Sequence, residues 1–397
     1  MHITIQKEAL SAVVSLASLT TIKDASSIFS HLLITPDVAR VLVQSTNQMT
    51  STSSALHYTQ IADKPRPFTV EADPFAKWLS NIEGEEVTLT VNADSVEAAC
   101  GRSVSYFRTM RPESFPSSIL SDSGELVGEL DAGAFFDMLD YAKHGLPDTS
   151  GGDSKIKENM KLVRFRENSA TATDSTVAFI VTSSALGEGV TLDLRIGASE
   201  VPSLLAFCKK VRGQKIKVLR TAAAVRFETA DGSIFGFSEP SYDHVRDFRS
   251  MLDFDDSKQP ILARLNLQEM SKAFKSVSAS ASPTSKSVVL TIQALSSVPA
   301  EGPVTGEIEL TREGTSSKNI NAAYFAAEFT QLKEDQIQYP VKIKLTLDQI
   351  TKMLNVFGSQ SGPVPVAVTL GNRTALRVSV MESSGAYKHF FCSFSLL

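Results

Sequence analysis

The strongest constraint in this 397-residue chain is an internal repeat. Six segments place apolar residues at the i, i+3, i+4, i+7 spacing that is typical of amphipathic helices. They begin near residues 7, 73, 131, 199, 266 and 346. Short alternating or β-branched runs, which are typical of strands, lie between them. Six copies of one helix-and-strands unit predict an array of small α+β units rather than one large core.

The strand runs repeat in a longer cycle. Each even-numbered helix is followed by two runs, a glycine-containing turn and a third run, whereas the odd-numbered helices are followed by a different strand set. The three turns are Gly101-Arg102-Ser103, Asp231-Gly232-Ser233 and Ser384-Gly385. Two units therefore make one domain. The pattern predicts three α+β domains, at 1–120, 121–253 and 254–397, each with two helices packed on antiparallel sheets.

Capping residues support the positions of five of the helices. Ser, Thr, Asp and Asn are preferred at a helix N-cap, because their side chains accept a hydrogen bond from a free backbone N–H group. The candidate caps are Asp73 before Pro74, Asp131, Ser199, Asn266 and Thr346.

Composition argues against several classes of protein. The net charge is −5, from 39 Lys+Arg and 44 Asp+Glu, so the protein does not coat itself in nucleic acid by bulk charge. The six histidines never pair at i, i+3 or i+4, and the three cysteines (Cys100, Cys208 and Cys392) are widely scattered, so we expect no metal site, no cofactor and no disulfide framework. The N-terminus alternates like a strand, which predicts no signal peptide and a cytoplasmic protein.

Several short motifs resemble the bacterial sliding clamp, the β subunit of DNA polymerase III. The motifs are Ser30-His31-Leu32-Leu33, Cys100-Gly101-Arg102-Ser103, Arg111-Pro112-Glu113-Ser114-Phe115-Pro116, Ala172-Thr173-Asp174 and Arg246-Asp247-Phe248-Arg249. They occur in the order of that family and span essentially the whole chain. The chain departs from the family after Asp174 and at its C-terminus, so it resembles a divergent member.

The resemblance implies a non-catalytic processivity factor. Such a protein encircles duplex DNA and tethers the replicative polymerase, with the polymerase and the clamp loader bound through short linear peptides. It also implies a head-to-tail homodimer, with Tyr106 and Phe107 of one chain opposite Val277 of the other. A clamp-fold adaptor that binds proteins but no longer encircles DNA is the alternative, whereas the sequence offers no carboxylate or histidine cluster for a hydrolase or nuclease.

Helix dimensions favour the dimer independently. Six helices, each about 10 Å across, would enclose a hole of only about 9 Å, whereas twelve would leave about 28 Å. A duplex is roughly 20 Å wide, as its groove depths indicate. One chain therefore cannot surround DNA, but two can.

Charge supports a DNA-facing helix layer. Residues 198–220 carry a net charge of +5, and the six helical windows together also total +5, which leaves −10 for the rest of the chain. The third window, with −2, does not fit a uniformly basic lining. The predicted phosphate contacts, without base readout, are Lys23, Lys77, Lys209, Lys210 and Arg212.

The resemblance also implies a peptide groove between the second and third domains. Carried over position by position, it consists of Thr173, Val177, Ala178, Arg246, Met251, Cys392, Phe394 and Leu396. Ala178 opens space where the family has leucine, and Phe394 fills space where it has methionine. We therefore expect weak binding of the common bacterial peptide and tighter binding of a cognate one.

Overall fold

The computed structural model describes most of the chain and divides into two compact units. The described residues are 1–116, 120, 124–147, 160–187, 192–222, 224–241, 261–279, 281, 284–294, 304–313, 320–331, 340–360, 362–369, 375–393 and 395–396. The first unit comprises 1–137 and 186–241, and the second comprises 138–185 and 242–397. The predicted domain boundaries stay a prediction.

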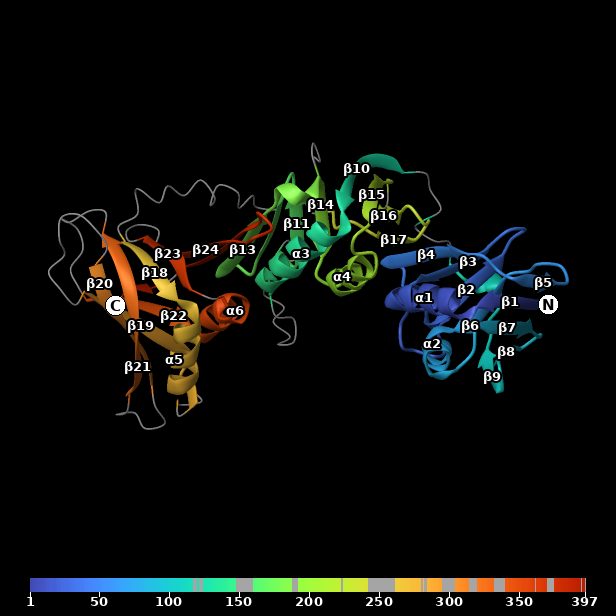
Figure 1. Cartoon of the computed structure of the whole chain (residues 1–397), viewed down its shortest axis with the longest axis horizontal. Helices are drawn as coiled ribbons and strands as arrows, with labels where there is room; N and C mark the ends of the chain where they lie inside the picture. The colour runs from blue at the N-terminus through green and yellow to red at the C-terminus, as the bar shows by residue number, and fades with distance from the viewer. Residues whose placement is uncertain are drawn as a thin grey trace. The chain divides into compact units, whose positions relative to one another are not determined.

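The helical spacing is confirmed at all six positions within the described residues (Figure 1). The helices are α1 (Lys7–Ala17), α2 (Ala72–Asn81), α3 (Ala132–Ala142), α4 (Val201–Lys210), α5 (Leu267–Ala279) and α6 (Leu347–Phe357). Each turns its apolar stripe inward, as Leu10 and Val14 of α1 and Ile350 and Phe357 of α6 do, all fully buried.

Three of the five predicted caps are confirmed. Asp131 Oδ1 accepts a hydrogen bond from Ala134 N at 2.7 Å, Asn266 Oδ1 accepts from Gln268 N at 3.1 Å, and Thr346 forms a capping box with Gln349. The caps predicted at Asp73 and Ser199 are wrong. Asp73 already lies in the first turn of α2, where it binds Lys77, and the Ser199 hydroxyl donates to the Glu200 carboxylate instead.

Two antiparallel sheets organise the first unit. One has the order β5-β1-β7-β8-β9 and the other β10-β15-β16-β17-β4-β3-β2-β6. The first contains β1 (His2–Gln6), β5 (Gln60–Ala62), β7 (Glu86–Val91), β8 (Ser95–Cys100) and β9 (Ser103–Arg108). The second contains β2 (His31–Pro36), β3 (Val41–Thr46), β4 (Thr50–Leu56), β6 (Phe68–Glu71), β10 (Glu125–Asp131), β15 (Lys215–Arg220), β16 (Val225–Thr229) and β17 (Ile234–Phe237). β14 (Asp193–Gly197) also belongs to this unit.

The second unit has the strand order β11-β12-β13-β25-β24-β23-β18-β21-β20-β19-β22-β26. Its strands are β11 (Leu162–Arg166), β12 (Ser169–Thr173), β13 (Val177–Thr182), β18 (Ile261–Asn266), β19 (Ser287–Ala294), β20 (Val304–Glu313), β21 (Ile320–Gln331), β22 (Val341–Thr346), β23 (Pro363–Thr369), β24 (Ala375–Met381), β25 (Tyr387–Ser393) and β26 (Ser395–Leu396). These strands confirm the runs predicted after the sixth helix. The third run, after the Ser384-Gly385 turn, forms two strands, β25 and β26.

Two strand pairings connect successive repeats. β4 of the first repeat pairs with β17, the last strand of the second, with Thr50 opposite Phe237. β13 of the second repeat pairs with β25, the strand after the Ser384-Gly385 turn of the third, with Val177 opposite Cys392. We call these pairings the first joint and the second joint. Each lies within one unit, so a continuous sheet crosses each boundary between repeats.

Candidate functional site

The predicted DNA contacts all lie in the first unit and differ in their partners. Lys23, in the loop after α1, and Lys209, at the end of α4, are exposed and have no partner among the described residues. Lys77 Nζ lies 2.7 Å from Asp73 one helical turn away, and the Lys210 ammonium donates to the Ser15 hydroxyl of α1. Lys23 and Lys209 are therefore the two most available cations of the predicted set.

Arg212 is held by the acidic third helix. Its guanidinium donates to both carboxylate oxygens of Asp137, at 3.0 and 3.1 Å, and stacks 5.4 Å from the centre of the Phe136 ring. Asp140, the next acid of α3, accepts from Lys143 at 2.5 Å. Asp140 and Lys143 already cancel within the −2 window, and Arg212 offsets a second carboxylate, Asp137. The third, Asp131, caps the N-terminus of α3.

A turn at the second joint carries the first residues of the predicted groove. Asp174 Oδ1 accepts from Thr176 N at 2.8 Å and Val177 N at 2.9 Å, which closes the turn between β12 and β13. The Thr173 hydroxyl donates to the Val177 carbonyl at 2.7 Å. Ser175 has φ +82°, a left-handed conformation that costs a non-glycine residue about 1–2 kcal/mol.

Helix α6 contacts this turn through a buried ion pair. Lys352 Nζ lies 2.5 Å from Asp174 Oδ2 and 3.1 Å from Asp348, and the Lys352 and Asp174 side chains are only 16% and 9% exposed. Burial raises the pKa of the Asp174 carboxyl, but hydrogen bonds from Lys352, Val177 and Thr176 outweigh it, so the net pKa lies below its ordinary value. The carboxylate therefore stays ionised at neutral pH.

The period of the strands divides the predicted groove between two faces of the sheet. Thr173 is opposite Ala178, and Ala178 is opposite Phe391, so these three side chains share one face. Val177 and Cys392 are opposite each other on the other face, both buried, in line with Phe179 and Phe390. Since Phe179 packs against Tyr141 of α3, that other face is the helix-covered one. Burial does not distinguish the two faces, because Thr173, Ala178 and Phe391 are buried as well, with 7%, 4% and 3% exposed. The groove residues therefore stay a prediction.

Four predicted groove residues remain, and the structure describes only the backbone of one of them. Arg246, Met251 and Phe394 lie outside the described residues. The backbone of Leu396 is part of β26, which pairs with β22 opposite Ile343. The structure thus brings Thr173 and Ala178 together on one face of the sheet, beside Phe391.

The residues predicted at the dimer contact differ in exposure. Tyr106 is 68% exposed and Val104 is 51% exposed on β9, the last strand of its sheet. The Phe107 ring is buried between Phe75 and Trp78, and Val277 is buried on α5. The side chains of Phe107 and Val277 therefore belong to cores, whereas the side of β9 that carries Val104 and Tyr106 is exposed.

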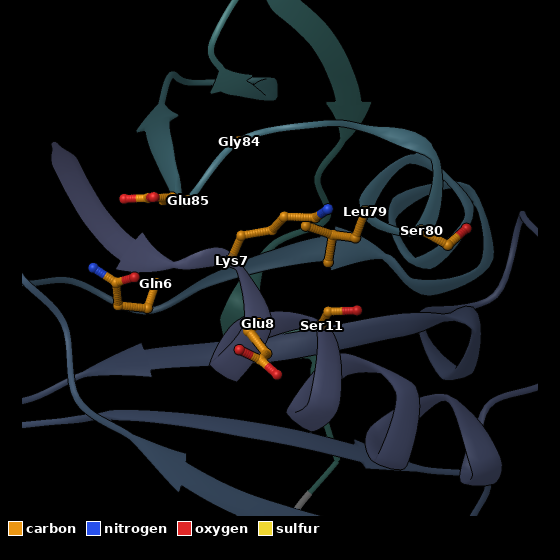
Figure 2. Close-up of a pocket in the computed structure, with 8 residues that line it drawn as sticks. All are labelled: Gln6, Lys7, Glu8, Ser11, Leu79, Ser80, Gly84 and Glu85. Atoms are coloured by element: carbon orange, nitrogen blue, oxygen red, sulfur yellow. The ribbon is translucent and has the colours of Figure 1, made fainter.

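A polar cavity of about 660 Å³ lies between the start of α1 and the end of α2 (Figure 2). Eight residues line it: Gln6, Lys7, Glu8, Ser11, Leu79, Ser80, Gly84 and Glu85. Lys7 Nζ donates to the Ile82 carbonyl at 2.5 Å. These eight residues include no histidine and no cysteine, so the cavity lining holds no Ser–His or Cys–His pair of the kind that activates a nucleophile.

Among the described residues, no three His, Cys, Asp or Glu side chains gather as a metal site requires. The same part of the chain has no helix long and apolar enough to cross a membrane.

Solved structures with the same architecture are bacterial sliding clamps. The DNA polymerase III subunit beta of Pseudomonas aeruginosa superposes with a TM-score of 0.81 at 14% identity, over 100% of both chains. The beta subunit of Thermotoga maritima gives 0.80 at 12% identity, over 100% of this chain and 99% of that one. The Helicobacter pylori beta clamp bound to a DNA ligase peptide gives 0.74 at 13% identity over both full chains.

No protein-family model matches the sequence, and no curated protein does so either. The predicted fold is nevertheless confirmed, since the likeness covers every repeat. The chain has the α+β sliding-clamp fold, with three repeats of two helices packed on antiparallel sheets.

Proposed function

We propose that this protein is a DNA sliding clamp, a non-catalytic processivity factor that closes around duplex DNA as a head-to-tail homodimer. One observation carries the proposal. Within the described residues, the chain makes two strand joints and leaves one strand edge of each kind without a partner strand.

The unused edges follow from the strand registers. At each joint the strand after the glycine-containing turn of one repeat pairs with the third strand of the β2-β3-β4 or β11-β12-β13 set of the repeat before it, as β17 does with β4 and β25 with β13. The last strand of the first repeat is β9, whose one neighbour in its sheet is β8. In the third repeat, β21 pairs with β18 only from residue 327 onward, so 320–326 have an edge without a β18 partner.

One edge, β9, corresponds to the strand that closes each joint, and the other, 320–326, to the strand that receives it. They come from the first and the third repeat. A long exposed edge strand is a liability that a partner strand removes. If β9 of one chain pairs with 320–326 of the next, the joint is made a third time. Two chains joined in this way at both ends form a closed ring of twelve helices.

DNA fits the ring by size and by charge. Twelve helices enclose a hole of about 28 Å, wider than a duplex of roughly 20 Å. Lys23 and Lys209 offer cations to phosphates without base readout, which suits sliding. Because duplex DNA lies in the bacterial cytoplasm, the protein would act there during DNA replication.

Polymerase and loader would bind through short peptides at the second joint. The Helicobacter pylori clamp, which shares this fold, was solved with a DNA ligase peptide. At the corresponding joint of this chain, Thr173, Ala178 and Phe391 share one face of the sheet and are buried, so the peptide would bind beside them. A few desolvated anchors can carry most of the binding energy of such a peptide.

Analytical ultracentrifugation of edge variants tests the ring contact. The wild-type chain should sediment as a dimer at micromolar concentration, and Tyr106→Asp should shift it to monomer, because a carboxylate would be buried against the partner strand. Val38→Asp is the matched control, since Val38 is 87% exposed on a hairpin of the same unit. A wild-type monomer, or a Tyr106→Asp variant that dimerises normally, would refute the proposed contact.

A further inference from the structure

The turn at the second joint has a twin at the first joint. Asn47 Oδ1 accepts from Met49 N at 3.0 Å and Thr50 N at 2.7 Å, as Asp174 does from Thr176 and Val177. The Thr46 hydroxyl donates to the Thr50 carbonyl at 3.1 Å, as Thr173 does at the second joint. Gln48, like Ser175, has a positive φ, of +75°.

The closing strand is attached in the same way at both joints. Ser238 N donates to the Met49 carbonyl at 3.0 Å, and Ser393 N donates to the Thr176 carbonyl at 3.3 Å. The first turn therefore shows what this backbone needs in order to form. A side-chain amide at the position of Asp174 and the hydrogen bond from the closing strand are sufficient to form the turn, and no ion pair is required.

Only the second turn is attached to a helix by a charge. Lys352 binds Asp174, and Gln349 Nε2, one turn earlier on α6, donates to the Ser393 carbonyl at 2.8 Å and to the Thr176 carbonyl at 3.5 Å. Aligned by its buried residues, α4 matches α6 with Leu204 at Ile350 and Phe207 at Met353. Ala206 then stands in place of Lys352, and Ser203 in place of Gln349.

We propose that Lys352 and Gln349 are positioning residues for the peptide groove, a role that rests on the proposed function. They fix the turn against α6 so that Thr173 and Ala178 stand in line with Phe391. A desolvated ion pair is expensive to build and adds little net stability, so its restriction to one of two otherwise equivalent turns favours a role in geometry. The expected ligand is an extended peptide with an apolar anchor that binds at the second joint.

Four variants separate positioning from folding. Asp174→Asn gives the second turn the chemistry of the first and removes the ion pair, and Lys352→Met removes it from the helix side. Lys352→Arg retains the charge. Asn47→Asp is the matched control, because the facing position of α4 is Ala206. The probe is the fluorescein-labelled DNA ligase peptide of the Helicobacter pylori complex, measured by anisotropy, with hydrogen exchange of segments 44–54 and 171–181 recorded on the same proteins.

Loss of the ion pair should weaken peptide binding by about tenfold, the order expected for one charge-assisted hydrogen bond. Asp174→Asn and Lys352→Met should both show this loss, with faster exchange confined to 171–181 and an unchanged dimer. Lys352→Arg should bind within about twofold of wild type, and Asn47→Asp should change neither readout.

Three other results would overturn the positioning role, and they can be told apart. Wild-type binding by Asp174→Asn and Lys352→Met would overturn the positioning role while leaving the groove intact. Equal weakening by Asn47→Asp would show a general effect of joint stability, which also overturns it. If the wild-type dimer does not bind the peptide even at millimolar concentration, the proposed groove fails, and the positioning role fails with it.

Discussion

Replacing Lys209 with alanine should reduce the salt dependence of DNA binding by a calculable amount. Each phosphate contact contributes about 0.9 to the slope of log K against log salt, so losing Lys209 from both chains of a ring should lower the slope by about 1.8. Between about 50 and 200 mM salt, that difference amounts to roughly a 12-fold smaller loss of affinity. The measurement is anisotropy of a labelled short duplex over a salt series.

Two controls make this prediction specific. Lys217 is also exposed, but Ile216 and Val218 beside it are buried, so its side chain stands on the face of β15 opposite the core. Lys217→Ala should leave the slope unchanged. Removing Arg212 and Asp137 together should also leave it unchanged, because that pair is already neutral. An unaltered slope for Lys209→Ala, or an equal drop for Lys217→Ala, would refute a DNA-facing α4.

Three further outcomes follow from the described residues. Ser175→Gly should raise the free energy of unfolding by up to about 1 kcal/mol in urea denaturation, because glycine tolerates a positive φ; Ser175→Ala should not. Burial first, and then the charge of Arg377, lowers the pKa of His389 to about 4, below its value in the unfolded chain. The free energy of unfolding should therefore fall as the pH drops from about 6.5 towards 4. His389→Gln should reduce that fall in denaturation experiments at a series of pH values. Burial raises the pKa of the Cys208 thiol, and that of Cys392 to about 12, so a thiol reagent at pH 8 should label both only after unfolding, and rapid native labelling of either would contradict their burial.

The helices and most strands were predictable because their signal is local. A helix must bury one stripe wherever it packs, so the spacing of Leu10 and Val14, or of Ile350 and Phe357, shows in the sequence. The caps at Asp131, Asn266 and Thr346 are local for the same reason.

Partnering between distant residues was not predictable. Nothing local to Arg212 signals that Asp137 neutralises it, or that Lys352 will meet Asp174 from 178 positions away. The groove was assigned by matching positions to a family, and its strand residues lie on both faces of the sheet, with Thr173 and Ala178 on one and Val177 and Cys392 on the other. Thr46-Asn47 in the first repeat corresponds to Thr173-Asp174 in the second, and comparing these two sequence segments would have identified the joints.

The central claim, closure around DNA, is tested most directly by topology. The protein is incubated with a nicked circular plasmid at a concentration that favours dimers, and bound protein is separated by gel filtration in high salt, where simple phosphate contacts are lost. The account predicts that protein stays on the circle and is released when one restriction cut makes the same DNA linear. Equal retention on circular and linear DNA, or none on either by a protein that dimerises, would contradict a ring and would favour an adaptor that binds proteins without encircling DNA.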